Sequence, residues 1–147
     1  MSKTELFRSL HHQPGHILKL PNAWDAGSAR LAESLGAEAI ATTSAGVAWA
    51  LGYADGNRMP ADQLLNVTRN IVRVVGVPVT VDFEGGYSNR PEVVAETICG
   101  FIDAGSAGIN IEDGIDAPAL LAAKIGAIKA TAAQMCADLL GNARCDV

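Results

Sequence analysis

The sequence is poor in aromatic residues and in basic residues. Aromatic side chains make up 5% of the 147 residues, which favours close packing of helices on a sheet over an aromatic-rich β-sandwich. Lys and Arg number 11 against 16 Asp and Glu, so the formal net charge is -5. This acidic balance argues against nucleic acid or an anionic membrane as the main partner. A small anionic ligand would therefore need a local basic group or a metal ion.

Cysteine pairs and long apolar runs are also missing. The three cysteines are widely spaced without a CxxC pair, which indicates neither a disulfide framework nor a zinc site, and we expect a cytoplasmic protein. No apolar run approaches the roughly 18 residues of a membrane helix, and the N-terminal sequence MSKTELFRSLHHQPGH lacks the pattern of a cleaved leader. Hydrophobic residues make up 49%, and no linker divides the chain. We therefore interpret residues 1–147 as a single core-rich domain.

Short apolar runs alternate with segments of helical period. Because strands that alternate with helices imply right-handed crossovers, the pattern predicts an α/β protein with a parallel sheet. Five strands are predicted, at His16–Leu20, Ala39–Ser44, Pro78–Glu84, Gly108–Asp113 and Leu139–Val147. Four helices are predicted, at about Asp25–Leu35, Ala61–Val75, Pro91–Gly105 and Pro118–Ala132, with a long loop at Ala45–Pro60.

Two architectures fit this alternation, a doubly wound sheet and part of a (β/α)8 barrel of the TIM type. The turn after the first run reads PNAWDAG and lacks the GxGxxG phosphate-binding pattern of many doubly wound sheets. Polar residues end the other runs, as expected where a barrel gathers its functional residues. Five strands and four helices amount to about half a barrel, and its open sheet edges predict a homo-oligomer or aggregation.

Acidic residues stand at the ends of two consecutive predicted strands. Asp82 and Glu84 are separated by one residue, so in a strand both carboxylates point to the same side. Glu112 ends the next strand, and Asp55 lies in the long loop. Such oxygen ligands suit Mg²⁺ or Mn²⁺, which often keep bound waters. The alternative is that these acids cap the following helices or lie in solvated loops.

Two further features could bind a carboxylate. The small residues Ser44, Ala45 and Gly46 directly follow a predicted strand, where exposed backbone N–H groups could bind an anion, unless they form an ordinary tight turn. Arg144 lies in a run of small residues and would seek a carboxylate partner. That partner is either a substrate or, as a structural salt bridge, Asp113 or Asp146.

Five motifs together resemble the isocitrate lyase and phosphoenolpyruvate mutase superfamily. They are LPNAWDAGSARLAE, TTSAG with GYADG, VPVTVDFEGGY, GINIEDG and NARCDV, and they span nearly the whole chain. The resemblance implies a (β/α)8 barrel that binds Mg²⁺ and a 2-oxo acid or its enolate. By motif, Asp82 is implied as the direct metal ligand, with Glu84, Asp55 and Glu112 holding metal-bound waters. Ser44, Ala45 and Gly46 are implied to grip the substrate carboxylate and Arg144 to pair with it, and Asp55 and Arg144 are the expected catalytic residues.

The chain departs from this superfamily after the fourth strand. The cysteine-bearing loop of its lyases is replaced by GIDAPALLAAK, the Lys-and-Asn-bearing loop of its mutases is missing too, and Cys145 replaces a threonine. We therefore expect an oxaloacetate-decarboxylase-like lyase first, and a methylisocitrate-type lyase or phosphonopyruvate-processing enzyme second. The remaining alternative is a catalytically inactive or assembly-dependent half barrel.

Overall fold

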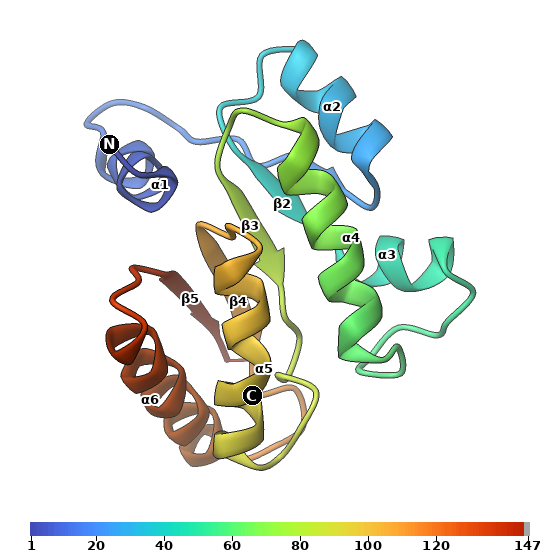
Figure 1. The fold of residues 1–147 in the computed structure, drawn as a ribbon, viewed down its shortest axis with the longest axis vertical. Helices are drawn as coiled ribbons and strands as arrows, with labels where there is room; N and C mark the ends of the chain where they lie inside the picture. Colours follow the sequence, from blue (N-terminus) through green and yellow to red (C-terminus); the bar gives the residue numbers. More distant parts are fainter. Residues whose placement is uncertain (146–147) are drawn as a thin grey trace.

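The computed structural model of the chain describes residues 1–145. Within this range five strands alternate with six helices (Figure 1). The strands are β1 (Asn22–Ala23), β2 (Ile40–Thr42), β3 (Val79–Asp82), β4 (Gly108–Glu112) and β5 (Leu140–Arg144). The helices are α1 (Lys3–His12), α2 (Ala26–Ser34), α3 (Ser44–Ala50), α4 (Ala61–Val74), α5 (Pro91–Asp103) and α6 (Pro118–Gln134).

The strands form one parallel sheet in which each strand lies beside the one before it in sequence. The strand order never reverses, as it would in a doubly wound sheet, so the topology is that of a (β/α) barrel. Helices α2, α4, α5 and α6 follow one another along one side of the sheet (Figure 1). The predicted α/β class and its five barrel-type strands are thus confirmed.

Alternate strand residues face the helices. Val81, Ile109 and Ile111 are buried in the apolar cluster that joins β3 and β4 to the helices. Asp82 and Asn110 are next to these residues in sequence, so they point to the opposite face. This alternation puts apolar groups under the helices and polar groups on the inner face of the sheet.

The first strand differs from its prediction. The run His16–Leu20 does not pair, and β1 forms later, in register with Ala41 and Thr42. Leu18 and Leu20 instead pack near α1, and Ile17 is 83% exposed. The leucines of this apolar run therefore pack near a helix. Periodicity alone does not show whether such a run packs on a helix or pairs in a sheet.

Two helices were not predicted, α1 and α3. Helix α1 begins with a capping box, in which the Ser2 hydroxyl accepts from the Glu5 N–H at 3.1 Å and the Glu5 carboxylate accepts from the Ser2 N–H at 2.6 Å. Helix α3 occupies the start of the predicted long loop and is capped by Thr43. Within residues 1–145, no helix is both long and apolar enough to cross a membrane.

Helix α1 covers the amino-terminal ends of the strands. Phe7 and Leu10 pack in one apolar cluster with Ala39 and Ala107, which precede β2 and β4. The opposite, carboxyl ends of the strands stay free of this helix. They carry the polar residues described next.

Candidate active site

Asp82, the last residue of β3, lies where three structural elements meet. One oxygen of its carboxylate accepts a hydrogen bond from the Ser44 N–H at 3.1 Å, and the other accepts from the Asn110 amide at 3.4 Å. The Asp82 backbone N–H donates to the Thr42 hydroxyl at 2.8 Å. The structure therefore brings two predicted site residues, Asp82 and Ser44, into contact.

A row of polar side chains crosses three strands at this level. Asp82 is in register with Asn110, and Asn110 with Asn142. The Asn142 amide donates to the Asn110 side-chain oxygen at 2.6 Å, which leaves the Asn110 amide nitrogen to donate to Asp82. These residues line a cavity of about 540 Å³ that also contains Arg144. The row fixes the orientation of the Asp82 carboxylate.

Sequence reasoning missed Asn110 and Asn142, although a signal was present. Asn110 lies two residues before Glu112, and Asn142 two before Arg144. Because side chains two apart in a strand share a face, each asparagine belongs to the same face as a predicted site residue. The two-residue period therefore indicates them once the strands are known.

Glu84 departs from its predicted placement. The expectation that it shares a side with Asp82 assumed a strand through Glu84, but β3 ends at Asp82 and Glu84 has a positive φ of 49°. Glu84 is 3% exposed as a whole residue. Its carboxylate accepts hydrogen bonds from the Tyr87 hydroxyl at 2.9 Å and from the Asn57 N–H. A turn, and not strand alternation, thus sets the direction of this carboxylate.

Tyr87 shows how acidic this region is. Burial raises the pKa of its hydroxyl far above the ordinary value of 10.0, and the charges of Glu84, Asp82 and Asp55 raise the pKa further. Three of the predicted carboxylates therefore lie near enough to act on one phenol. Asp55 contributes from the exposed loop between α3 and α4.

Glu112 and Arg144 form an ion pair across β4 and β5. The partner is thus Glu112, where the sequence alternative named Asp113 or Asp146, because the register places Glu112 directly opposite Arg144. Asp113 instead accepts a contact from the Cys145 thiol at 2.8 Å, and Asp146 lies outside the described residues. The Arg144 side chain is 52% exposed, so its guanidinium remains accessible.

The small residues Ser44, Ala45 and Gly46 form the first turn of α3 and not a tight turn. The Ser44 N–H donates to Asp82, and the Gly46 N–H donates to the Thr43 hydroxyl at 3.4 Å. This helix begins here because Thr43 supplies a side-chain cap. The segment orients Asp82, while its contact with a substrate stays a prediction.

The helix-capping alternative for the acids does not match the structure. The N-cap residues of α5 and α6 are Arg90 and Ala117, and neither makes a side-chain capping bond. Asp82, Glu84 and Glu112 are held by other contacts. The solvated-loop alternative fits Asp55, which is exposed in the loop between α3 and α4.

The carboxylates do not form a compact cage. Among residues 1–145, no three His, Cys, Asp or Glu side chains lie close enough to hold one ion together. Mg²⁺ commonly binds one or two carboxylates directly and keeps several waters. The all-oxygen donor set of Asp82, Glu84 and Glu112 fits that ion through one direct contact and water, and the metal site stays a prediction.

The fold and the acidic strand ends define part of a barrel-type α/β protein, and comparisons identify its family. A family profile described as phosphoenolpyruvate phosphomutase matches residues 7–147. The chain belongs to this family, within the phosphoenolpyruvate mutase and isocitrate lyase superfamily. The predicted superfamily is confirmed.

Individual relatives agree with this assignment. An uncharacterized protein of Mycobacterium tuberculosis is 41% identical over 145 residues, covering 95% of this chain and 52% of its own length. The 2-methylisocitrate lyase of Escherichia coli K12 is 35% identical over 101 residues, which cover 68% of this chain and 34% of that enzyme.

Solved structures show the same fold. A candidate phosphonomutase from Burkholderia cenocepacia J2315 superposes with a TM-score of 0.91 at 45% identity, over 98% of this chain and 61% of that one. Oxaloacetate acetylhydrolase gives a TM-score of 0.88 at 28% identity, over 99% and 53% of the two chains. The chain thus spans about half the length of most relatives that it matches.

Proposed function

We propose that this chain carries part of the active site of a Mg²⁺- or Mn²⁺-dependent carbon–carbon lyase or decarboxylase that acts on a small 2-oxo or 2-hydroxy carboxylic acid. The observation that carries the proposal is the Asp82 carboxylate, which Ser44 and Asn110 orient at the carboxyl end of β3. A carboxylate has about four acceptor positions, so two hydrogen bonds leave room for a metal contact. Membership of the family supports this use of the site.

The carboxylates have different roles in this proposal. Asp82 binds the ion directly, while Glu84, Glu112 and Asp55 reach it through water. This division agrees with the lack of a compact three-ligand cluster within the described residues. A bound Mg²⁺ would supply a Lewis acid that withdraws charge from the 2-oxo oxygen during bond cleavage.

Arg144 is the residue proposed to hold the substrate carboxylate. Its guanidinium has five N–H donors, so it can bind a carboxylate while it keeps Glu112 as a partner. Ser44 to Gly46 would complete the carboxylate site. Fixing the carboxylate that stays orients the scissile bond for cleavage.

Decarboxylation of an oxaloacetate-like acid is the first choice of reaction. Residues 113–117, between β4 and α6, read DGIDA and carry no Cys, Lys or His. Decarboxylation needs an electron sink but no base that deprotonates a hydroxyl group. Cleavage of a methylisocitrate-like acid is second, and phosphonopyruvate processing is third. The family profile is named for a phosphomutase, and similar proteins include a 2-methylisocitrate lyase and an oxaloacetate acetylhydrolase, which supports this range of small acids.

An assay with three substrates tests the proposal. Oxaloacetate, methylisocitrate and phosphonopyruvate are supplied one at a time with Mg²⁺, and pyruvate, succinate and phosphate are measured, with the Asp82→Asn variant as the inactive control. We expect pyruvate from oxaloacetate as the main product. Faster release of succinate from methylisocitrate than of pyruvate from oxaloacetate would reverse the order of substrates, and no turnover of any of the three would contradict an enzymatic role.

A non-catalytic, assembly-dependent chain is the second candidate. Leu31 on α2 and Leu35 just after it are 61% and 80% exposed, beside a shallow cavity of about 810 Å³ at the β1 edge. Exposed apolar surface next to an edge strand favours association. Light scattering after size-exclusion chromatography tests this, because a monodisperse monomer that unfolds cooperatively would contradict obligatory assembly.

A further inference from the structure

The turn that follows β3 has an unusual backbone. Glu84, Gly86 and Tyr87 have positive φ angles of 49°, 85° and 62°, of which only the glycine adopts the value without cost. A Cβ on Gly86 would also lie 2.9 Å from Val94. Strained non-glycine residues persist only where the surroundings hold them. The turn therefore depends on outside contacts.

Three neighbouring segments supply those contacts. The Glu112 N–H donates to the Glu84 carbonyl at 3.0 Å, and the Asn57 N–H donates to the Glu84 carboxylate. From α6, the Lys124 ammonium donates to the Gly85 carbonyl at 2.8 Å. Gly85 lies between Glu84 and Gly86, which both have positive φ angles. Lys124 thus acts on the centre of the turn.

A lysine is energetically unfavourable at position 124. It is 2% exposed, and burial lowers the pKa of its ammonium group, opposed by the charge of Asp116 at 3.9 Å. An apolar side chain of similar volume would cost less at a buried helix position. The other buried residues of α6 are Leu121, Ile128 and Ala132. A buried lysine among these apolar residues therefore indicates a specific role for Lys124.

We propose that Lys124 is a positioning residue, whose ammonium group holds the Gly85 carbonyl and so fixes the turn that presents the Glu84 carboxylate to the metal site at Asp82. The inference rests on the proposed function for its metal part. Lys124 lines a cavity of about 520 Å³ with Asn57, Tyr87 and Glu112. It therefore touches the same space as Asn57 and Tyr87, the residues that hold the Glu84 carboxylate.

Two measurements on the full chain test the inference. The variants are Lys124→Met, which removes the donor, Lys124→Arg, which keeps one, and Lys129→Met, a control at an exposed position of the same helix. Amide hydrogen exchange by NMR reads the turn without metal, at the N–H groups of Asn57 and Glu112. Titration calorimetry then compares the affinities for Mg²⁺ and Ca²⁺ in the presence of oxalate.

We expect Lys124→Met to speed exchange at Asn57 and Glu112 about tenfold while the amides of β4 elsewhere are unchanged. Its preference for Mg²⁺ over Ca²⁺ should fall about tenfold, because Mg²⁺ demands strict geometry and Ca²⁺ tolerates a loose ligand. A general loss of folded protein would lower both affinities equally. Lys124→Arg should recover part of both effects, and Lys129→Met should show neither.

Other outcomes decide against the inference. Unchanged exchange at the two amides in Lys124→Met, or uniform acceleration along the chain, would overturn the positioning role. Absence of Mg²⁺ binding in the wild-type chain would overturn the proposed function and the metal part, while the exchange data would still show whether Lys124 holds the turn. An unchanged Mg²⁺ to Ca²⁺ preference with faster local exchange would overturn the link to Glu84.

Discussion

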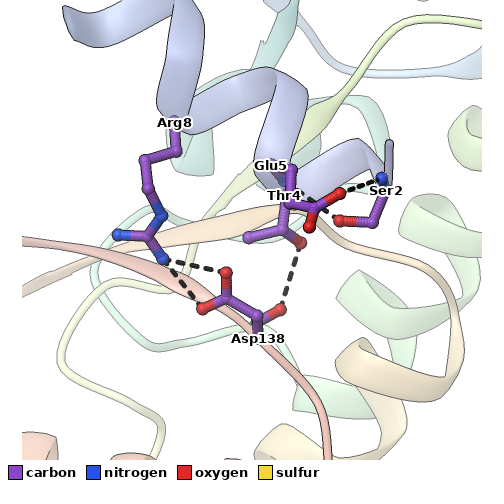
Figure 2. Close-up of polar contacts among 5 residues, drawn as sticks. All are labelled: Ser2, Thr4, Glu5, Arg8 and Asp138. Carbon is purple, nitrogen blue, oxygen red and sulfur yellow. Dashed lines mark hydrogen bonds and ion pairs between the residues drawn. The ribbon is translucent and has the colours of Figure 1, made fainter.

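The two ends of the sheet are built from different interactions. At the amino-terminal end, α1 is held by an apolar cluster and by Arg8, which makes bonds of 2.8 and 2.9 Å to the Asp138 carboxylate (Figure 2). The Thr4 hydroxyl adds a bond of 3.0 Å to the Asp138 carbonyl. At the carboxyl end, Asp82 and Glu84 are fixed by polar contacts next to a strained turn.

Because the two ends differ in this way, we expect mutations to affect stability and metal binding separately. Apolar packing with a half-exposed ion pair serves stability, and barrel proteins keep their reacting groups at the carboxyl end. Polar groups held in a strained backbone are typical of functional sites. Changes at one end should therefore leave the property of the other end nearly intact.

The largest expected effect on stability is at the amino-terminal end. Phe7→Ala should lower the free energy of unfolding by about 4 kcal/mol, because Phe7 is 2% exposed and fills the cluster under α1. Urea denaturation followed by circular dichroism measures this loss. Ile17→Ala, at an exposed position, should change the free energy by less than about 0.5 kcal/mol. A loss below about 1 kcal/mol for Phe7→Ala would show that α1 does not stabilise this end.

Asn110→Leu should lower Mg²⁺ affinity at the carboxyl end of the sheet. Removing its amide leaves the Asp82 carboxylate without one of its two orienting donors. We expect Mg²⁺ affinity to fall about tenfold, as is usual when the partner of a metal ligand is lost. Calorimetry measures the affinity, and Asn66→Leu, on an exposed part of α4, is the control. Equal affinities would mean that Ser44 alone orients Asp82.

Asp25 differs from the other acids near the carboxyl end, because it stabilises a helix. Its side chain caps α2 by accepting from the Ser28 N–H at 2.7 Å. Asp25→Ala should cost about 1 kcal/mol in the free energy of unfolding, and Asp25→Ser should recover most of it. Mg²⁺ affinity should not change in either variant, and a change would place Asp25 in the site.

The capping contribution should also depend on pH. The Ser28 N–H and hydroxyl bonds hold the folded-state pKa of Asp25 below its ordinary value of 3.8. The unfolded chain thus binds the proton more tightly, so the stabilisation is full well above pH 3.8 and is lost as pH falls through the folded-state pKa. The free energies of unfolding of wild type and Asp25→Ala, measured by urea denaturation, should therefore converge at acidic pH. A constant difference would contradict the assignment.

The smallest effect belongs to the exposed ion pair of α1. Arg8→Ala should cost about 0.5 kcal/mol or less in the free energy of unfolding, and less still in high salt. The pair is 46% and 53% exposed, so water already screens it. Thermal denaturation at two salt concentrations measures the cost. A loss that persists in high salt would indicate that Arg8 contributes by packing.

The sequence predicts the repeated units of the fold well and its irregular parts poorly. The strands β2 to β5 and the helices α2, α4, α5 and α6 follow from apolar period, Pro starts and Gly stops. The run His16–Leu20 was predicted as a strand because periodicity does not show whether its leucines face a helix or pair in a sheet. Helix α3 was missed because its short, small-residue sequence resembles a loop.

The candidate site divides in the same way. Asp82, Glu84, Glu112 and Arg144 were predicted because each stands at a predicted strand end. Their contacts depend on register and on a turn with positive φ, which involve residues far apart in sequence. The Arg144–Glu112 pair and the Lys124 contact were therefore beyond local patterns.

Mg²⁺ binding by variants at the two ends of the sheet tests where the metal site lies. Isothermal titration with Mg²⁺ and oxalate compares the wild type with Asp82→Asn at the carboxyl end and Asp138→Asn at the amino-terminal end. We expect equal binding in the wild type and Asp138→Asn, and no measurable binding in Asp82→Asn. Unchanged Mg²⁺ affinity in Asp82→Asn would contradict a metal site at the carboxyl end of β3. A loss of affinity in Asp138→Asn as large as the loss in Asp82→Asn would contradict it as well.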